Sequence, residues 1–306
     1  SGSREELVQY TSNQALDLTP PTDERPFFFN QLPLYDPLRT INLAFVTGSA
    51  GVVSGNLFAT ATLLILFFIS VALVLVTIVL PLRSAVRDVG RNLALGGTAY
   101  FLLIGVGFMS VEIGLLQRMS VFLGHPIYSL SVVLFSIILT TGAGSLLSDR
   151  LPLDSRRKLI VWSVLTSGYL VLLPLWLPEV LLAFESAALP IRAGWCVLVI
   201  APAGVLMGYG FPTGMRMISA VDRTPTPWFW GINGAAGVVA ATLAVTCSIA
   251  LGISATLIIG GLCYLLLMPA ALAIGSKSGY QKSPEVVFPS LRSLRTSPAR
   301  RPSNPA

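Results

Sequence analysis

Residues 57–80 read LFATATLLILFFISVALVLVTIVL and include no charged side chain. An α-helix rises about 1.5 Å per residue, so about 20 apolar residues are enough to cross the roughly 30 Å hydrocarbon layer of a bilayer. A helix of a soluble protein needs an apolar stripe on one face only, whereas this stretch is apolar all round. The stretch therefore predicts a transmembrane helix.

Apolar stretches of similar length recur along the chain. The candidate spans are 57–80, 93–116, 127–147, 159–177, 194–215, 230–251 and 255–274. Hydrophobic residues make up 54% of the 306 residues and charged residues only 11%, against about 25% charged residues in soluble domains. This composition excludes an ordinary soluble protein. We predict an all-α fold, a polytopic transmembrane helical bundle of about seven spans.

The segments between the spans differ in charge, and this difference predicts the orientation. Most of the 20 Lys and Arg residues fall on one side of the alternating path, in segments 81–92, 148–158 and 216–229 and after residue 274. Basic residues beside a span are retained in the cytoplasm. We therefore expect an integral protein of the inner (plasma) membrane with a cytoplasmic C-terminus and an extracytoplasmic N-terminal segment. The net charge of +6 then reflects topology and does not indicate a nucleic-acid partner.

Composition also divides the chain into four parts. Residues 1–56 are mixed and polar and are interpreted as the tail of a preceding soluble domain with a linker. Residues 57–80 form a connecting helix, and 81–274 form a six-helix membrane domain. Residues 275–306 are rich in Ser, Pro, Lys and Arg and predict a disordered basic tail. Because the chain begins at Ser1 without a signal-peptide pattern, we expect it to be part of a longer protein.

Two polar residues inside predicted spans are candidates for a substrate or proton site. An ionised side chain at the centre of a span costs about 2.5–3.5 kcal/mol on insertion scales, so Glu112 is expected to face a cavity or a partner, or else to reach the interface. Arg118, six residues on, is not on the same helical face. Asn233 lies beside a small-residue face that includes Gly234 and Gly237, and its amide can bond to a neighbouring helix.

The remaining motifs indicate no chemistry in this chain. The three cysteines lie in apolar stretches without the spacing of a metal site. His125 precedes Pro126 and is the only histidine, which favours a turn residue. The segment 208–216, GYGFPTGMR, is typical of a kinked helix whose glycines serve packing. We predict no catalytic residue, no bound cofactor and no metal ion.

The loop GSLLSDR at 144–150, followed by the basic cluster 156–158, resembles the cytoplasmic loop motif of the major facilitator superfamily. The resemblance implies that residues 93–274 form one six-helix half of such a protein. It also makes Asp149 and Arg150 candidates for a cytoplasmic charge clamp between helices.

Several longer phrases are similar to bacterial proteins in which a major-facilitator-like membrane domain is fused to a spermidine-synthase-like domain. They are TDERPFFF (22–29), GFMSVE (107–112) continuing to Gln117-Arg118, FLGHP (122–126), GFPTGMR (210–216) and WGING (230–234). The resemblance implies that an aminopropyltransferase-like domain precedes this chain, so that the catalytic domain itself is absent here. Whether the longer protein is an enzyme is left open.

Two functions remain open from the sequence. One is a transporter-like domain for a polyamine or another small polar substrate, completed by a missing N-terminal membrane half or another chain. The other is a non-transporting membrane anchor and scaffold for the attached aminopropyltransferase-like domain. The expected partners are the lipid bilayer and those missing parts, without nucleic acid. The transporter-like domain is the leading interpretation and the scaffold is the alternative, although the scarcity of polar groups near mid-membrane, mainly Glu112 and Asn233, counts in favour of the scaffold.

Overall fold

The computed structural model of the chain describes residues 21–27 and 54–275. Its helices are α3 (Ser54–Val74), α4 (Leu80–Leu82), α5 (Arg91–Leu123), α6 (Pro126–Arg150), α7 (Arg156–Ala183), α8 (Leu189–Gly208), α9 (Gly210–Val221), α10 (Thr226–Leu251) and α11 (Ile253–Gly275). A π-helical turn at Leu75–Val79 joins α3 to α4. The described ranges contain no β-strand, only an isolated bridge between Thr22 and Arg25. Our predictions for most of 1–56 and for the tail after 275 lie outside the described residues.

Seven helical segments of the described chain are long and apolar enough to cross a membrane. Large apolar side chains point outward along them, for example Phe135, Leu146 and Leu175, which are 69%, 72% and 72% exposed. Side chains of this kind on the outer surface of long helices suit contact with lipid, where every backbone polar group must be bonded within the helix. The prediction of an all-α, polytopic bundle with about seven spans is confirmed.

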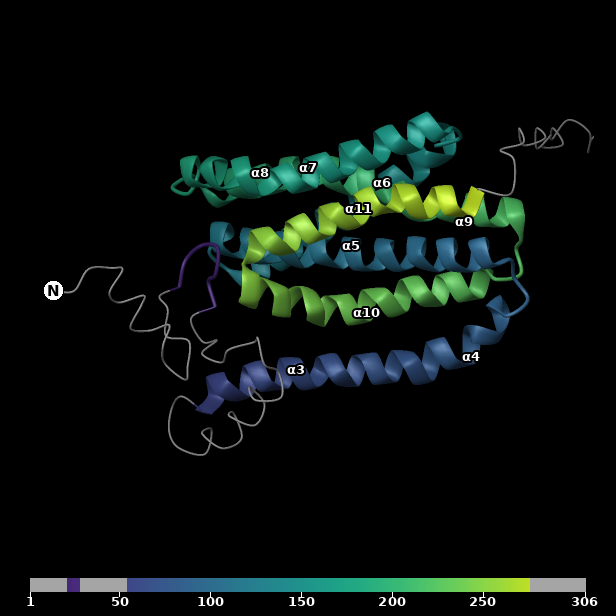
Figure 1. The fold of residues 1–306 in the computed structure, drawn as a ribbon. Helices are drawn as coiled ribbons and strands as arrows, with labels where there is room; N and C mark the ends of the chain where they lie inside the picture. Colours follow the sequence, from purple (N-terminus) through teal and green to yellow (C-terminus); the bar gives the residue numbers. More distant parts are fainter. Residues whose placement is uncertain (1–20, 28–53, 276–306) are drawn as a thin grey trace, which may run out of the picture.

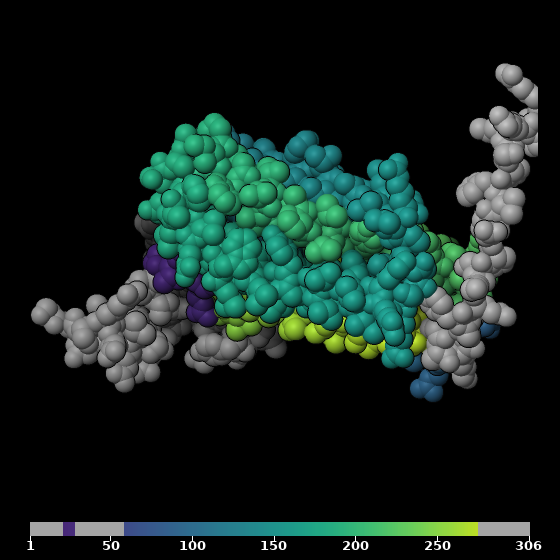
Figure 2. Space-filling view, turned by 90° about the horizontal axis from the view of Figure 1, so that it is seen from above, coloured from purple at the N-terminus to yellow at the C-terminus, as the bar shows by residue number. Residues whose placement is uncertain are grey.

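The helices form layers, and α5 lies at the centre (Figure 1). Helix α5 packs mainly against α11 on one side and α10 on the other, α11 also packs on α7, and α6 pairs with α8. Helix α3 is peripheral and contacts chiefly α10. In the space-filling view of Figure 2, the teal and green surfaces of α6, α7 and α8 form the near face, and segment 21–27 (purple) lies at one end.

Aromatic residues fill the centre of the bundle. Tyr100 and Phe101 of α5 are fully buried, as is Phe229 of α10, whose ring stacks on that of Phe101 at 5.6 Å between centroids. The Tyr100 hydroxyl donates to the backbone oxygen of Gly210 at 2.9 Å, where α8 passes into α9. This bond satisfies a buried polar atom and ties α5 to the break between α8 and α9.

Glycines allow the closest helix contacts. A Cβ atom on Gly260 of α11 would lie 2.6 Å from Val111 Cγ2 and 3.1 Å from the backbone oxygen of Gly107 on α5. Gly144 of α6 and Gly208 of α8 meet the facing backbone in the same way. Lipid is as apolar as the side chains, so helix association in a bilayer depends on such close packing.

The bundle has two ends, which we name by an acidic residue at each. The Glu24 end holds segment 21–27, the last residues of α5 and α10, and the start of α11 (Figure 1). The Asp149 end holds the end of α6 and helix α9. The orientation of these ends across a membrane remains a prediction.

Candidate functional site

A tight turn at the Glu24 end presents the acidic side chain to the helices. The backbone N–H of Arg25 donates to the Thr22 oxygen at 2.9 Å and the N–H of Thr22 donates to the Arg25 oxygen at 3.2 Å. The Thr22 hydroxyl oxygen also accepts from the Arg25 N–H at 3.1 Å. These three bonds close the turn and hold Glu24 at its tip.

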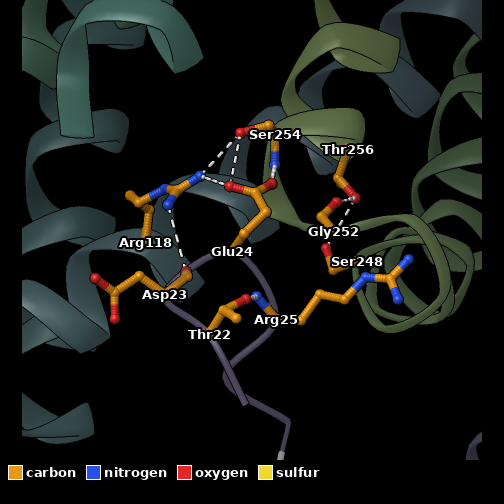
Figure 3. Close-up of polar contacts among 9 residues, drawn as sticks. All are labelled: Thr22, Asp23, Glu24, Arg25, Arg118, Ser248, Gly252, Ser254 and Thr256. Carbon is orange, nitrogen blue, oxygen red and sulfur yellow. Dashed lines mark hydrogen bonds and ion pairs between the residues drawn. The ribbon is translucent and has the colours of Figure 1, made fainter. Parts of the chain in front are cut away.

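Glu24 caps the start of α11 (Figure 3). Its Oε1 accepts the Ser254 backbone N–H at 2.5 Å, its Oε2 accepts the Ser254 hydroxyl at 2.9 Å, and its backbone oxygen accepts the Ile253 N–H at 3.1 Å. A helix N-terminus carries unpaired N–H groups and a partial positive charge, so a carboxylate is a favourable partner there. Gly252, at φ 98°, provides the space for this carboxylate, because a Cβ atom there would lie 2.9 Å from Oε1 of Glu24.

The same carboxylate pairs with Arg118, near the end of α5. The two side chains approach to 2.5 Å between Nη2 and Oε2, and the Arg118 side chain is only 6% exposed whereas that of Glu24 is 40% exposed. Arg118 also donates to the backbone oxygen of Asp23 at 3.3 Å and to the Ser254 hydroxyl at 2.9 Å. A buried guanidinium thus has a carboxylate partner and two further acceptors, as a buried charge requires.

Arg25 binds the end of α10. Its Nη2 donates to the backbone oxygen of Ala250 at 2.5 Å, in the last turn of α10, where unpaired carbonyl groups favour a cation. We call the turn Thr22–Arg25, with its contacts to Arg118, Ala250, Ile253 and Ser254, the Glu24 latch. The latch joins the ends of α5, α10 and α11 to a segment that precedes the first span.

Acid is expected to release the latch. Burial raises the pKa of Glu24, but the hydrogen bonds from Arg118 and Ser254 and the positive charge of Arg118 together lower it more, so the pKa lies below its ordinary value of 4.5. A depressed folded-state pKa means that the stabilisation is complete above the ordinary pKa and is lost as pH falls through the folded value.

The measurement is the difference in unfolding temperature between the wild type and Glu24→Gln as a function of pH in detergent. We expect a constant difference at neutral pH that shrinks toward zero only below about pH 4.5. A difference that persists undiminished under acidic conditions would contradict the ionised latch.

The two candidates found inside spans lie apart from each other and from the latch. Glu112 is half-buried on α5 and has no hydrogen-bond or ion-pair partner among the described residues. The side-chain oxygen of Asn233 on α10 is buried and also without a partner in the described part. The Asn233 backbone oxygen lies against Gly105 of α5, seven residues before Glu112, which places the two residues about 10 Å apart along the helices.

At the opposite end, Asp149 makes an interhelical ion pair with Arg216. Nη1 of Arg216, on α9, lies 2.9 Å from Oδ1 of Asp149, on α6. Arg216 also donates to the Thr213 hydroxyl at 3.3 Å. Arg150 is exposed and the described residues offer it no such partner. The ion pair between these helices therefore joins Asp149 to Arg216, with side chains that are 71% and 38% exposed, and the role of Asp149 and Arg150 as a cytoplasmic charge clamp stays a prediction.

His125 has a structural role. His125 is the N-cap of α6, and its Nδ1 accepts the backbone N–H of Ile127 at 3.2 Å. Within the described residues, no cluster of three or more His, Cys, Asp or Glu side chains is placed to hold a metal ion.

No family model, no curated protein and no solved structure matches this chain.

Proposed function

We propose that this chain is a membrane anchor and scaffold that holds an extramembrane part of the same protein, on the extracytoplasmic side, in a fixed position against the bundle. The observation that carries the proposal is the Glu24 latch, which binds a segment before the first span to three helix ends. The sequence resemblance supports an aminopropyltransferase-like domain as the part that is held.

The ordering of the latch segment is informative. Fixing the backbone of the turn Thr22–Arg25 against the helices costs about 1–2 kcal/mol of conformational entropy per residue. A segment needed only to lead into a span gains nothing from this ordering. Charge-assisted bonds to Arg118 and to the start of α11 offset the cost, which suits a scaffold that must fix the direction in which the preceding chain leaves the membrane.

Distances between spin labels test the scaffold. One label is placed at Pro21→Cys and one at Leu251→Cys, both exposed, after replacement of the three native cysteines. We expect a narrow distance distribution in the otherwise native protein and a broad one in Glu24→Gln. Asp149→Asn, which removes a carboxylate from the other end, is the matched control and should keep the narrow distribution. A broad distance distribution in the labelled protein that retains Glu24 would refute the scaffold proposal.

Glu112 favours a second function, transport of a polyamine or another small polar substrate. An ionisable group without a partner inside a span is the usual mark of a proton or substrate pathway, and the resemblance to the major facilitator superfamily supports the same interpretation.

We expect Glu112→Gln in the full-length protein to abolish proton-gradient-dependent uptake of labelled putrescine or spermidine into proteoliposomes. The amide keeps the size of the side chain but cannot carry a proton. Loss of uptake should occur without a change in unfolding temperature. If the well-folded wild type takes up no polyamine, this second function is excluded for those substrates.

A further inference from the structure

A pocket of about 430 Å³ opens at the Glu24 end between α5, α7 and α8, a size within the usual range for small-molecule sites. We call it the Arg192 pocket. Its charged or polar lining residues are Asp23, Arg118, Glu185, Ser186 and Arg192, and its apolar lining residues are Val121, Phe122, Pro178, Leu181 and Leu182. The lining of the pocket therefore combines apolar side chains with charges of both signs.

Arg192 gives the pocket an unsatisfied cation. Its Nη1 donates to the Phe122 backbone oxygen at 2.8 Å, and its buried Nε has no acceptor in the described part of the chain. Its Nη2 is not buried and also has no hydrogen-bond or ion-pair partner among the described residues. Leaving a buried donor of a charged group unbonded costs free energy, and such groups normally have a partner. Arg118, in contrast, already has Glu24. The accessible Nη2 of Arg192 is thus the guanidinium nitrogen in this pocket that an anionic group can bind.

Two carboxylates supply the opposite charge. Asp23 and Glu185 are exposed, and neither side chain has a hydrogen bond or an ion pair with any described residue. Figure 3 shows the Asp23 carboxylate directed away from Glu24 and Arg25, so it takes no part in the latch. Ammonium groups pair with such carboxylates through short, charge-assisted bonds.

The apolar lining residues indicate the rest of the ligand. Leu181 is buried, whereas Leu182 is 58% exposed and Val121 41% exposed at the outer surface of the bundle. An apolar tail that leaves the pocket along these side chains would enter the lipid layer beside α7, and a short apolar side chain would remain within the pocket.

We propose that the Arg192 pocket binds a small amphiphilic zwitterion, with its anionic group at Arg192, its primary ammonium group at Asp23 and Glu185, and its apolar part against Leu181 and Leu182. Two sources have this chemistry: the headgroup of an aminophospholipid and a free apolar amino acid. The pocket shares Asp23 and Arg118 with the latch, but the three groups proposed to bind the ligand, the guanidinium of Arg192 and the carboxylates of Asp23 and Glu185, make none of the latch bonds. The proposal extends beyond the scaffold function.

Native mass spectrometry of the full chain in detergent tests the lipid source. Three phospholipids with identical acyl chains are compared: phosphatidylethanolamine, phosphatidylcholine and phosphatidylglycerol. Phosphatidylcholine cannot donate hydrogen bonds from its methylated amine, and phosphatidylglycerol has no ammonium group. We expect phosphatidylethanolamine to bind at least about tenfold more tightly than the others, because each lacks one charge-assisted contact.

Variants assign the charges. Arg192→Gln should weaken phosphatidylethanolamine binding about tenfold. The double variant Asp23→Asn with Glu185→Gln should weaken it by the same factor and leave the binding of phosphatidylglycerol unchanged. The two carboxylates are exposed, so their replacement keeps the fold even if Arg192→Gln does not. Arg156→Gln, an exposed arginine at the Asp149 end, is the matched control and should have no effect.

Calorimetric titration with leucine tests the soluble source. Binding of leucine that Arg192→Gln or the double carboxylate variant abolishes, without selective binding of phosphatidylethanolamine, assigns the pocket to a free amino acid; the reverse result assigns it to lipid. The proposal is overturned if neither ligand binds, or if all three lipids bind equally and the variants change nothing.

Discussion

Gly144→Ala is expected to lower the free energy of unfolding by about 3 kcal/mol, because one added methyl group forces α6 away from α8. A Cβ at Gly144 would overlap the Val205 backbone oxygen and lie 2.9 Å from its carbonyl carbon. Backbone atoms inside a helix cannot turn aside as a flexible side chain does. Relief of the overlap therefore requires movement of α8 as a whole, with loss of the contacts along the α6–α8 seam.

Gly142→Ala is the matched control. It lies on the same helix, two residues earlier, and a Cβ there would meet no atom within 4 Å. The added methyl group should leave the unfolding free energy unchanged or raise it slightly, since Ala is the better helix former by about 1 kcal/mol. Reversible unfolding in mixed micelles measures both variants, and equal effects would show that the seam is not closely packed.

The number and place of the spans could be predicted because each span is a local property. The stretch 57–80 has enough apolar residues to cross the bilayer wherever its neighbours lie. Helix ends were less predictable: the fifth span was expected at 194–215, but helical structure extends over Leu189–Val221, with a break at Tyr209. Helical backbone bonding continues into the polar headgroup region, where the apolar signal has already ended.

The candidate site was less accessible to sequence reasoning. Glu112 and Asn233 were found because a polar residue stands out within an apolar stretch. The pair Glu24–Arg118 was missed because its members lie 94 residues apart and only the fold brings them together. One signal was present: Arg118, a cation at the end of a span with no local partner, needs an acceptor from elsewhere. TDER at 22–25 supplied a carboxylate within a turn, but one sequence could not connect the two.

A double-mutant cycle of Glu24→Gln and Arg118→Met should give the second large effect. Met retains much of the apolar volume of the arginine stem. Arg118→Met is expected to lower the unfolding free energy by about 3 kcal/mol, since Glu24 and Ser254 lose a shared donor, and Glu24→Gln by about 2 kcal/mol. The value for Glu24→Gln is discounted because the Glu24 side chain is 40% exposed and water partly replaces its partner. The double variant should lose about 1–2 kcal/mol less than the sum.

The cycle of Asp149→Asn and Arg216→Gln is the internal comparison. It removes the same types of charged group, held at 2.9 Å, but with side chains that are 71% and 38% exposed. Exposed pairs couple by at most about 1 kcal/mol. A larger coupling at Glu24–Arg118 would follow from the burial of Arg118 and from the bonds to α11, which only the latch provides. Equal couplings in the two cycles would mean that the latch is an ordinary surface ion pair, too weak to hold the turn Thr22–Arg25 in place, and the scaffold proposal would lose its physical basis.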